Sequence, residues 1–289
     1  MVQLFTDTDC DMTPALCAEY GYKLISMPYT IDDKMVCPYE DFETFDAHAF
    51  YERLRQGTMA TTSAISVERY TEYFEPDFAA GNDILYVHFS AAMTNTFDFM
   101  KQAVDALLAK YPERKFYEVD AKGITIAGLN VVLSVADLYK AGKTPEEIVK
   151  WAETEVDKHA IYFTSGDLKF FHRSGRVSGL SATMGTLLGI KPIMYMSSEG
   201  KMMAVGKEKG RRKALGYLVN KMVELGEDVK NHRIIIGHTD NTGMVEEISE
   251  MIRDTFGADT EIMVVDVNPT AGAHCGPDGL GVAFYAKNR

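Results

Sequence analysis

Hydroxyl side chains are concentrated in one segment that precedes an expected helix. Thr61 to Ser66 reads Thr-Thr-Ser-Ala-Ile-Ser, and the helix-like pattern begins just after it. Ser66 alone is enough to cap that helix, because one side-chain oxygen at the N-cap accepts a bond from the first turn. Thr62 and Ser63 are then free to donate hydrogen bonds to a ligand.

A second hydroxyl-rich segment, Ser90 to Thr96, lies between a strand-like run and a helix-like run. In open α/β sheets ligands bind beyond the carboxyl ends of strands, where a helix N-terminus presents free N–H groups to an anion. Simple capping by Thr94 or Asn95 explains the segment equally well. Asp7, which follows the first strand-like run, is expected to be a turn or cap residue.

Two further segments carry cations or glycines. Asp167 to Arg176 ends in Ser-Gly-Arg, and Arg176 could hold a carboxylate or phosphate with two hydrogen bonds, or form an ordinary surface ion pair. Thr270 to Gly279 is predicted as a glycine-rich loop around His274. Glycines allow close backbone approach to a ligand, whereas a single histidine is more often structural.

Several classes of enzyme lack their sequence signatures. The chain has no phosphate-binding lysine loop, no strand-linked G-x-G-x-x-G, no H-E-x-x-H and no G-x-S-x-G. Its four cysteines form no C-x-x-C pair and lack histidines at zinc-ligand spacing, so we expect free thiols and no metal site.

Length and charge narrow the possibilities further. A chain of 289 residues is long enough for about two domains. Its 30 Lys and Arg against 42 Asp and Glu give a net charge of -12, which disfavours nucleic acid as a partner. The apolar runs are shorter than the ~18 residues of a membrane span. The first residues lack the features of a secretory signal, and we expect a cytoplasmic protein.

Strand-like and helix-like segments alternate, which predicts an α/β fold with a largely parallel sheet. The predicted strands are 2–6, 23–30, 84–89, 115–119, 161–164, 192–196, 233–237, 262–267 and 282–286. The predicted helices are 46–56, 67–78, 96–110, 124–141, 145–158, 209–225 and 242–256. The helix at 124–141 is apolar nearly all round and should be buried. We predict two α/β domains, residues 1–158 with the hydroxyl-rich loops and residues 159–289 with the arginine and histidine loops.

The order of these segments resembles one protein family, the DegV family, from end to end. Thr6-Asp7-Thr8 is similar to its T-D-S start, Thr62 to Ser66 to its T-S-x-P-S loop with Ile65 for proline, and Ser90 to Thr96 to its S-x-x-L-S-G-T loop. Ser174-Gly175-Arg176 resembles its G-G-R turn, residues 187–192 its L-L-x-I-K-P segment, and residues 272–277 its G-x-H-x-G-P loop.

The resemblance implies a bacterial fatty-acid-binding protein that presents its ligand to a fatty acid kinase for acyl phosphate formation, and that is not itself an enzyme. It implies an apolar tunnel for a long chain such as palmitate, stearate or oleate, and no cofactor. The carboxylate would be held at an interdomain cleft. The implied binding residues are Thr62, Ser63, Thr94, Asn95, Arg176 and His274. Asn95 departs from the family, which has glycine there, and could alter the headgroup pocket.

Two other functions stay open. One is a phosphotransferase-like enzyme in which His274 accepts a phosphate or acts as a base for Thr94 or Ser63. The other is a regulatory module that senses a small metabolite. Whatever the function, we expect a monomer.

A cluster of cations stands out in this acidic chain. It comprises Lys207, Lys209, Arg211, Arg212 and Lys213. The cluster is explained either as the solvated start of a helix or as a docking patch for an acidic face of the kinase.

Overall fold

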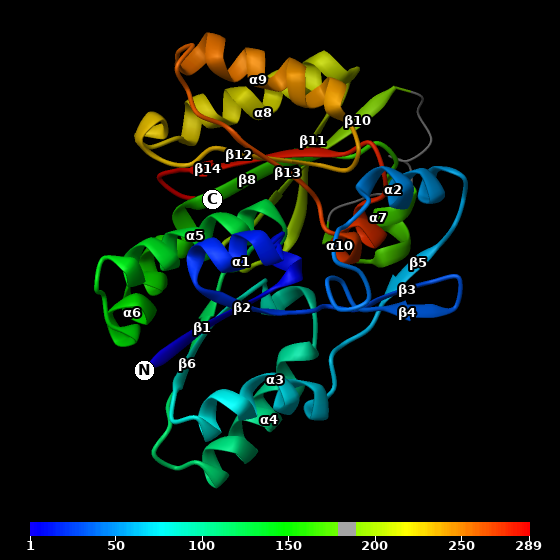
Figure 1. The fold of residues 1–289 in the computed structure, drawn as a ribbon. Helices are drawn as coiled ribbons and strands as arrows, with labels where there is room; N and C mark the ends of the chain where they lie inside the picture. Colours follow the sequence, from blue (N-terminus) through cyan, green and yellow to red (C-terminus); the bar gives the residue numbers. More distant parts are fainter. Residues whose placement is uncertain (179–188) are drawn as a thin grey trace.

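The computed structural model describes residues 1–178 and 189–289, and they form alternating layers of helices and sheets (Figure 1). Helices α8 (Arg211–Leu225) and α9 (Thr242–Phe256) cover one face of a seven-stranded sheet. Helix α5 (Ile126–Lys140) packs against the other face and also contacts a four-stranded sheet. The far side of that second sheet is covered by α3 (Val67–Ala79) and α4 (Thr96–Lys110) (Figure 1).

The four-stranded sheet has the order β2-β1-β6-β7, and all its pairs are parallel. Its strands are β1 (Val2–Asp7), β2 (Tyr22–Ile25), β6 (Asp83–His88) and β7 (Phe116–Asp120). The chain leaves β1 toward β2 on one side, while β6 and β7 lie on the other. The carboxyl ends of β1 and β6 therefore form the topological switch point where ligands of open α/β sheets bind.

The seven-stranded sheet has the order β13-β12-β14-β8-β10-β11-β9 and is mixed. Its strands are β8 (His159–Thr164), β9 (Val177–Ser178), β10 (Ile190–Met196), β11 (Met202–Lys209), β12 (Ile235–His238), β13 (Met263–Asp266) and β14 (Leu280–Tyr285). The expectation of a largely parallel sheet is wrong here. Strands β10 and β11 form an antiparallel hairpin across a short turn, and β14 runs antiparallel to both of its neighbours.

The remaining elements are shorter. A third sheet has the order β4-β3-β5, with β3 (Tyr29–Ile31), β4 (Lys34–Val36) and β5 (Ala60–Thr62). The other α-helices are α1 (Pro14–Tyr20), α2 (Ala47–Arg55), α6 (Pro145–Glu155), α7 (Leu168–Ser174) and α10 (Pro269–Cys275). Single 3-10 turns are η1 (Thr8–Cys10), η2 (Ala91–Met93), η3 (Val156–Lys158) and η5 (Val229–Asn231).

All seven predicted helices are present, but the sequence predictions differ from the structure at several places. Helix α1 was not predicted, and the segment 167–176, expected to be a loop, contains helix α7. Residues 23–30, predicted as one strand, form β2 and β3 in different sheets. Strand β11 was not predicted, so Lys207 and Lys209 lie on a strand and not at a helix start. The predicted loop around His274 is largely helix α10. Residues 187 and 188 of the family-like segment lie outside the described residues.

One hydrophobic core continues across α5 and includes residues from both large sheets. Leu129 and Val132 of α5 are fully buried, and the same core contains Ile235 of β12 and Ala283 of β14. Helix α5 is therefore buried on several sides, as its sequence predicts. All strands of the four-stranded sheet precede η3, and all strands of the seven-stranded sheet begin at β8 or later. Because the two sheets share one core, the division into two domains stays a prediction. No helix in the described ranges has the length and hydropathy to cross a membrane.

Candidate functional site

A cavity of about 230 Å³ lies at the carboxyl ends of β1 and β6, and it is called the polar cavity below because charged, amide and hydroxyl side chains form part of its walls. Its walls come from β5, from the segments before α3 and α4, and from α10 of the other half of the chain. All of the residues expected to bind a ligand line it, namely Thr62, Ser63, Thr94, Asn95, Arg176 and His274. The structure thus brings together residues up to 212 positions apart.

Thr62 and His274 form a polar pair of side chains in this cavity. The Oγ1 atom of Thr62 lies 2.8 Å from Nε2 of His274, within hydrogen-bond distance. Helix α10 positions the histidine, and Asn268 caps that helix by accepting a bond from the N–H of Ala271. Burial, together with the positive charges of Arg176 and Arg173, lowers the pKa of His274 to about 4. The imidazole is therefore neutral at neutral pH.

Thr94 faces the cavity from the start of α4. Its Oγ1 accepts a hydrogen bond from the N–H of Thr96 at 3.1 Å, which leaves the hydroxyl proton available to a ligand. The Asn95 side chain is exposed and makes no capping bond. The hydroxyl of Thr96 accepts a bond from the N–H of Ile65, so the two hydroxyl-rich segments are tied together. The N-terminus of α4 adds a partial positive charge here.

Arg176 supplies the cation of the cavity. Helix α7 ends at Ser174 and is capped by Gly175, whose φ of 64° is readily adopted by glycine, and the chain then turns toward β9. The Arg176 guanidinium donates to the carbonyl of Ser174 at 2.5 Å. Within residues 1–178 and 189–289, no carboxylate forms a salt bridge with Arg176. Its charge is available to an anion. Ser63 is exposed at the edge of the same cavity.

Other lining residues were not predicted, and they include Asp9, Met27, Thr270 and Cys275. Asp9 follows the first strand by two residues, so the rule that ligands bind beyond strand ends could have identified it. Met27 and Cys275 carry no such signal, because a buried methionine or thiol is common in any core.

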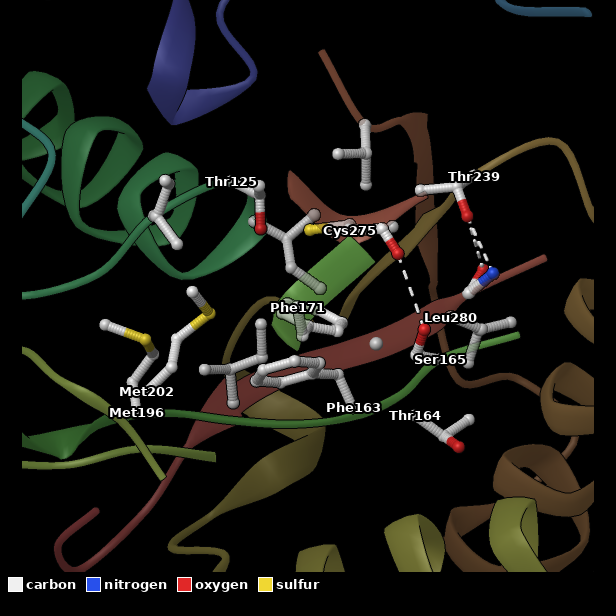
Figure 2. A pocket seen from close by; sticks show the side chains of 17 residues that line it. Thr125, Phe163, Thr164, Ser165, Phe171, Met196, Met202, Thr239, Cys275 and Leu280 are labelled. Atoms are coloured by element: carbon white, nitrogen blue, oxygen red, sulfur yellow. Dashed lines mark hydrogen bonds between the residues drawn. The ribbon is translucent and has the colours of Figure 1, made fainter. Parts of the chain in front are cut away.

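A narrow apolar cavity of about 50 Å³ lies next to the polar one. Both cavities are lined by Ile124, Met202 and Cys275, so they adjoin at these residues. The apolar cavity lies between α5 and the seven-stranded sheet (Figure 2). Its walls are mostly apolar, with the Met196 and Met202 side chains together in one part and the Phe163 and Phe171 rings nearby (Figure 2).

Two of the hydroxyl groups that line the apolar cavity bond to the protein itself, whereas the Thr164 hydroxyl has no hydrogen-bond partner among the described residues. The Ser165 hydroxyl donates to the carbonyl of Cys275, and the Thr239 hydroxyl accepts a bond from the N–H of Gly279 at 2.6 Å (Figure 2). They are therefore poorly placed to bind a polar ligand. The arrangement suits a ligand with an anionic head and an apolar tail.

Metal chemistry finds no support in the described ranges. No group of three or more metal-ligating side chains occurs among the residues that the structure describes. All four cysteines, Cys10, Cys17, Cys37 and Cys275, are free thiols.

In a comparison with known protein families, the model of one family matches nearly the whole chain. A family model described as "Uncharacterised protein, DegV family" matches residues 1–287. A DegV domain-containing protein of Clostridium perfringens is 31% identical over 286 residues, which cover 99% of this chain and 98% of that protein.

Solved structures with the same fold include three described as binding fatty acids. A stearic acid-binding protein of Eubacterium ventriosum has a TM-score of 0.86 at 18% identity, and 99% of each chain is covered. A fatty-acid-binding DegV family protein of Thermus thermophilus has a TM-score of 0.84 at 22% identity, again with 99% of each chain covered. The Fatty Acid Kinase B3 protein of Streptococcus pneumoniae, loaded with linoleic acid, has a TM-score of 0.83 at 21% identity, with 99% of this chain and 100% of that one covered.

Proposed function

The chain belongs to the DegV family, and from that premise we propose that it binds one long-chain fatty acid across the two adjoining cavities. The observation that carries the proposal is that a polar and an apolar cavity share three lining residues, Ile124, Met202 and Cys275. The carboxylate occupies the polar cavity, and the acyl chain extends between α5 and the seven-stranded sheet.

The acyl chain supplies most of the affinity. Burying it contributes roughly 0.8 kcal/mol per methylene, on the order of ten kcal/mol in total before association costs are subtracted. The cavity is narrow at about 50 Å³, so side chains must move to admit the ligand. Met196 and Met202 suit this role because methionine is unbranched and flexible.

The polar cavity fixes the orientation of the ligand. A carboxylate that leaves water without hydrogen-bond partners is strongly destabilised, so donors must meet it. Thr62, Thr94 and Arg176 are such donors, and His274 orients the Thr62 hydroxyl. Ser63 and Asn95 lie at the exposed edge, where they would contact the headgroup from outside.

Presentation of the carboxyl group to a fatty acid kinase is the second part of the proposal. The Streptococcus pneumoniae relative is described as a fatty acid kinase B protein, which favours a kinase partner here. Five exposed cations offer a docking surface, Lys207 and Lys209 on β11 and Arg211, Arg212 and Lys213 on α8. Arg211 pairs with Glu247 of α9 at 2.7 Å, which reduces its free charge.

The contacts of His274 do not favour the phosphotransferase alternative. The Nε2 atom bonds to Thr62 and not to Thr94 or Ser63. A pKa of about 4 also makes this imidazole a weak base.

Mass spectrometry of the purified protein tests the proposal. Native spectra should show one adduct, and denaturing spectra should identify it as a long-chain fatty acid. After lipid removal, palmitate or oleate should bind with a stoichiometry of one. A bound sugar phosphate or nucleotide, or a stripped protein that ignores both fatty acids, would refute the proposal.

A further inference from the structure

Asp9 places a second carboxyl group in the cavity proposed to take the ligand carboxylate. The residue lines the polar cavity and is only 5% exposed. Its Oδ1 atom is buried and has no hydrogen-bond partner among the described residues. The N–H of Thr125, at the start of α5, donates to the main-chain carbonyl of Asp9 at 2.6 Å and not to its carboxyl group.

The two neighbouring aspartates are bonded very differently. The Asp7 carboxylate accepts bonds from the N–H groups of Cys10 and Phe89 and from the Tyr86 hydroxyl. Asp11 accepts two bonds from Asn268, one from its N–H and one from its side-chain amide. Among the described residues, Asp9 has no comparable donors and forms no salt bridge, so its ionised form lacks the stabilisation that Asp7 and Asp11 receive.

Burial and the negative charges of Asp7 and Asp11 raise the pKa of Asp9 well above its ordinary value. An anionic headgroup in the same cavity acts in the same direction, because two like charges in a poorly hydrated space repel each other. When a ligand carboxylate and a protein carboxyl group share one site, the two groups together therefore keep one proton.

We propose that Asp9 is protonated whenever an anionic headgroup occupies the polar cavity, so that the affinity for a fatty acid depends on the protonation of this one side chain. The inference rests on the proposed function. Asp9 then determines how much negative charge the cavity accepts. A ligand head with a single negative charge binds as long as the Asp9 carboxyl group is neutral.

Several other titratable groups lie near Asp9, and their protonation must be distinguished from that of Asp9. On its own segment these are Asp7, Cys10 and Asp11, and burial raises the pKa of Asp7 to about 6 and that of Asp11 to about 7. Tyr70 of α3 and Cys275 of α10 have pKa values raised by burial and by Asp9. The other groups facing the cavity are His274, whose lowered pKa leaves it neutral, and the Arg176 guanidinium.

The experiment compares the wild type with Asp9→Asn by calorimetric titration of the lipid-free proteins with oleate from about pH 6 to about pH 10. Asparagine keeps the size and polarity of the neutral acid. In the wild type, affinity should fall about tenfold for each pH unit above the pKa of Asp9 in the free protein, because binding then requires uptake of a proton. Asp9→Asn should bind with an affinity that lacks this decline.

Two further measurements test whether the pH dependence comes from Asp9. Asp11→Asn should keep the decline, because Asp11 is bonded to Asn268 and does not line the cavity. Titrations of the wild type in two buffers with different ionisation heats should show proton uptake in the declining range. If Asp9→Asn does not fold, Asp9→Ser provides the same comparison.

Identical pH profiles of the wild type and the Asp9 variant would overturn the inference, and so would a decline that is lost in Asp11→Asn but kept in Asp9→Asn. In those cases oleate binds and the proposed function stands. Absence of oleate binding by every protein at every pH would instead refute the proposed function.

Discussion

Three aspartates of one short segment have three different roles, which shows how strongly partners determine the behaviour of a side chain. Asp7 caps η1, as the sequence predicts, but it is also fully buried and bonded to Tyr86. Asp11 binds Asn268 from the other half of the chain. Asp9 has no such donors in the part of the chain that the structure describes, and it faces a cavity. Residue type and spacing alone therefore could not distinguish the three.

Thr94 is the residue through which headgroup binding can be tested most directly. Thr94→Val removes the hydroxyl at nearly constant volume, and a charge-assisted hydrogen bond contributes about 1.5 to 3 kcal/mol. Fatty acid affinity should therefore fall about tenfold or more. Thr94→Ser keeps the hydroxyl and should bind nearly as well as the wild type. Isothermal titration of the stripped proteins measures both affinities.

The valine variant also leaves the N–H of Thr96 without its acceptor, so folding must be checked by circular dichroism. Equal affinities of the two Thr94 variants would mean that this hydroxyl only caps α4. An enzyme that used Thr94 as a nucleophile would instead keep substrate affinity in the valine variant and lose turnover.

His274 should make the stability of the protein depend on pH. Its pKa is about 4 in the folded state against about 6.5 in the unfolded chain, so unfolding takes up a proton between these values. The contribution is fully present above about pH 6.5 and is lost as the pH falls toward 4, and it amounts to about 3 kcal/mol. His274→Gln should lack this contribution.

Urea unfolding of both proteins at about pH 7 and about pH 4 measures the difference. Buried Asp7 and Asp11 have raised pKa values and change stability in the opposite direction, but they do so in both proteins and cancel. His172→Gln, at an exposed position of α7, is the matched control and should follow the wild type. A His274→Gln profile parallel to that of the wild type would contradict the assignment.

At the scale of elements, the sequence predicted periodic segments well and irregular ones poorly. The bounds of α4 and α9 match the prediction, because their apolar residues recur with helical spacing. The segment 23–30 contains Pro28, which cannot donate to a sheet, and the chain changes sheets there. Strand β11 carries alternating charges in its second half and therefore looked like part of a polar helix.

The candidate site was predicted more completely than the elements that carry it. All six residues expected from the family resemblance line one cavity, although His274 comes from a helix and not a loop. Helix α10 has only seven residues and contains Gly272, so its sequence gives little helical signal. Thr125 also has an unusual φ of 55° that its residue type does not indicate.

Gly281 of β14 offers a test of the tunnel at the level of the sheet and α5. A Cβ atom added there would lie 3.0 Å from Cβ of Phe163 and 3.5 Å from Cδ1 of Ile126, inside the wall of the apolar cavity. Gly281→Ala should lower the free energy of unfolding by about 1 kcal/mol through overpacking. It should also weaken oleate binding several-fold, whereas a short-chain acid should be affected less.

Gly206→Ala is the matched control for this substitution. Gly206 also lies on a strand, and among the described residues its added Cβ would meet only the Tyr217 hydroxyl, at 4.0 Å. Titration with acids of increasing length should leave this variant unchanged. An equal effect of Gly206→Ala and Gly281→Ala would show that the apolar cavity does not hold the acyl chain.

At the scale of the whole molecule, contacts between the two halves of the chain surround the cavities. Thr270 donates to the carbonyl of Met27, and the Ser90 hydroxyl donates to the carbonyl of Gly200. Farther away, Arg55 of α2 pairs with Asp240 and Asp278. Because both cavities lie within this interface, ligand binding and the packing of the two halves are linked.

If the exposed cations of β11 and α8 form a docking surface for a kinase, reversing their charge should slow association with it. Lys207→Glu combined with Arg212→Glu reverses two charges that have no ion-pair partner among the described residues, whereas Arg211 is paired with Glu247. The association rate constant with the fatty acid kinase of the same organism should fall about tenfold at low salt. The difference should shrink at high salt, because added ions screen exposed charges.

Surface plasmon resonance or stopped-flow mixing at two salt concentrations measures this rate constant, and oleate affinity should stay at the wild-type value. Lys101→Glu combined with Lys150→Glu is the control, since both lysines are exposed on helices of the other half, α4 and α6. It changes the net charge by the same amount. Equal slowing by the two double variants would mean that only the overall charge of the protein matters, because a local docking surface requires the β11 and α8 cations in particular.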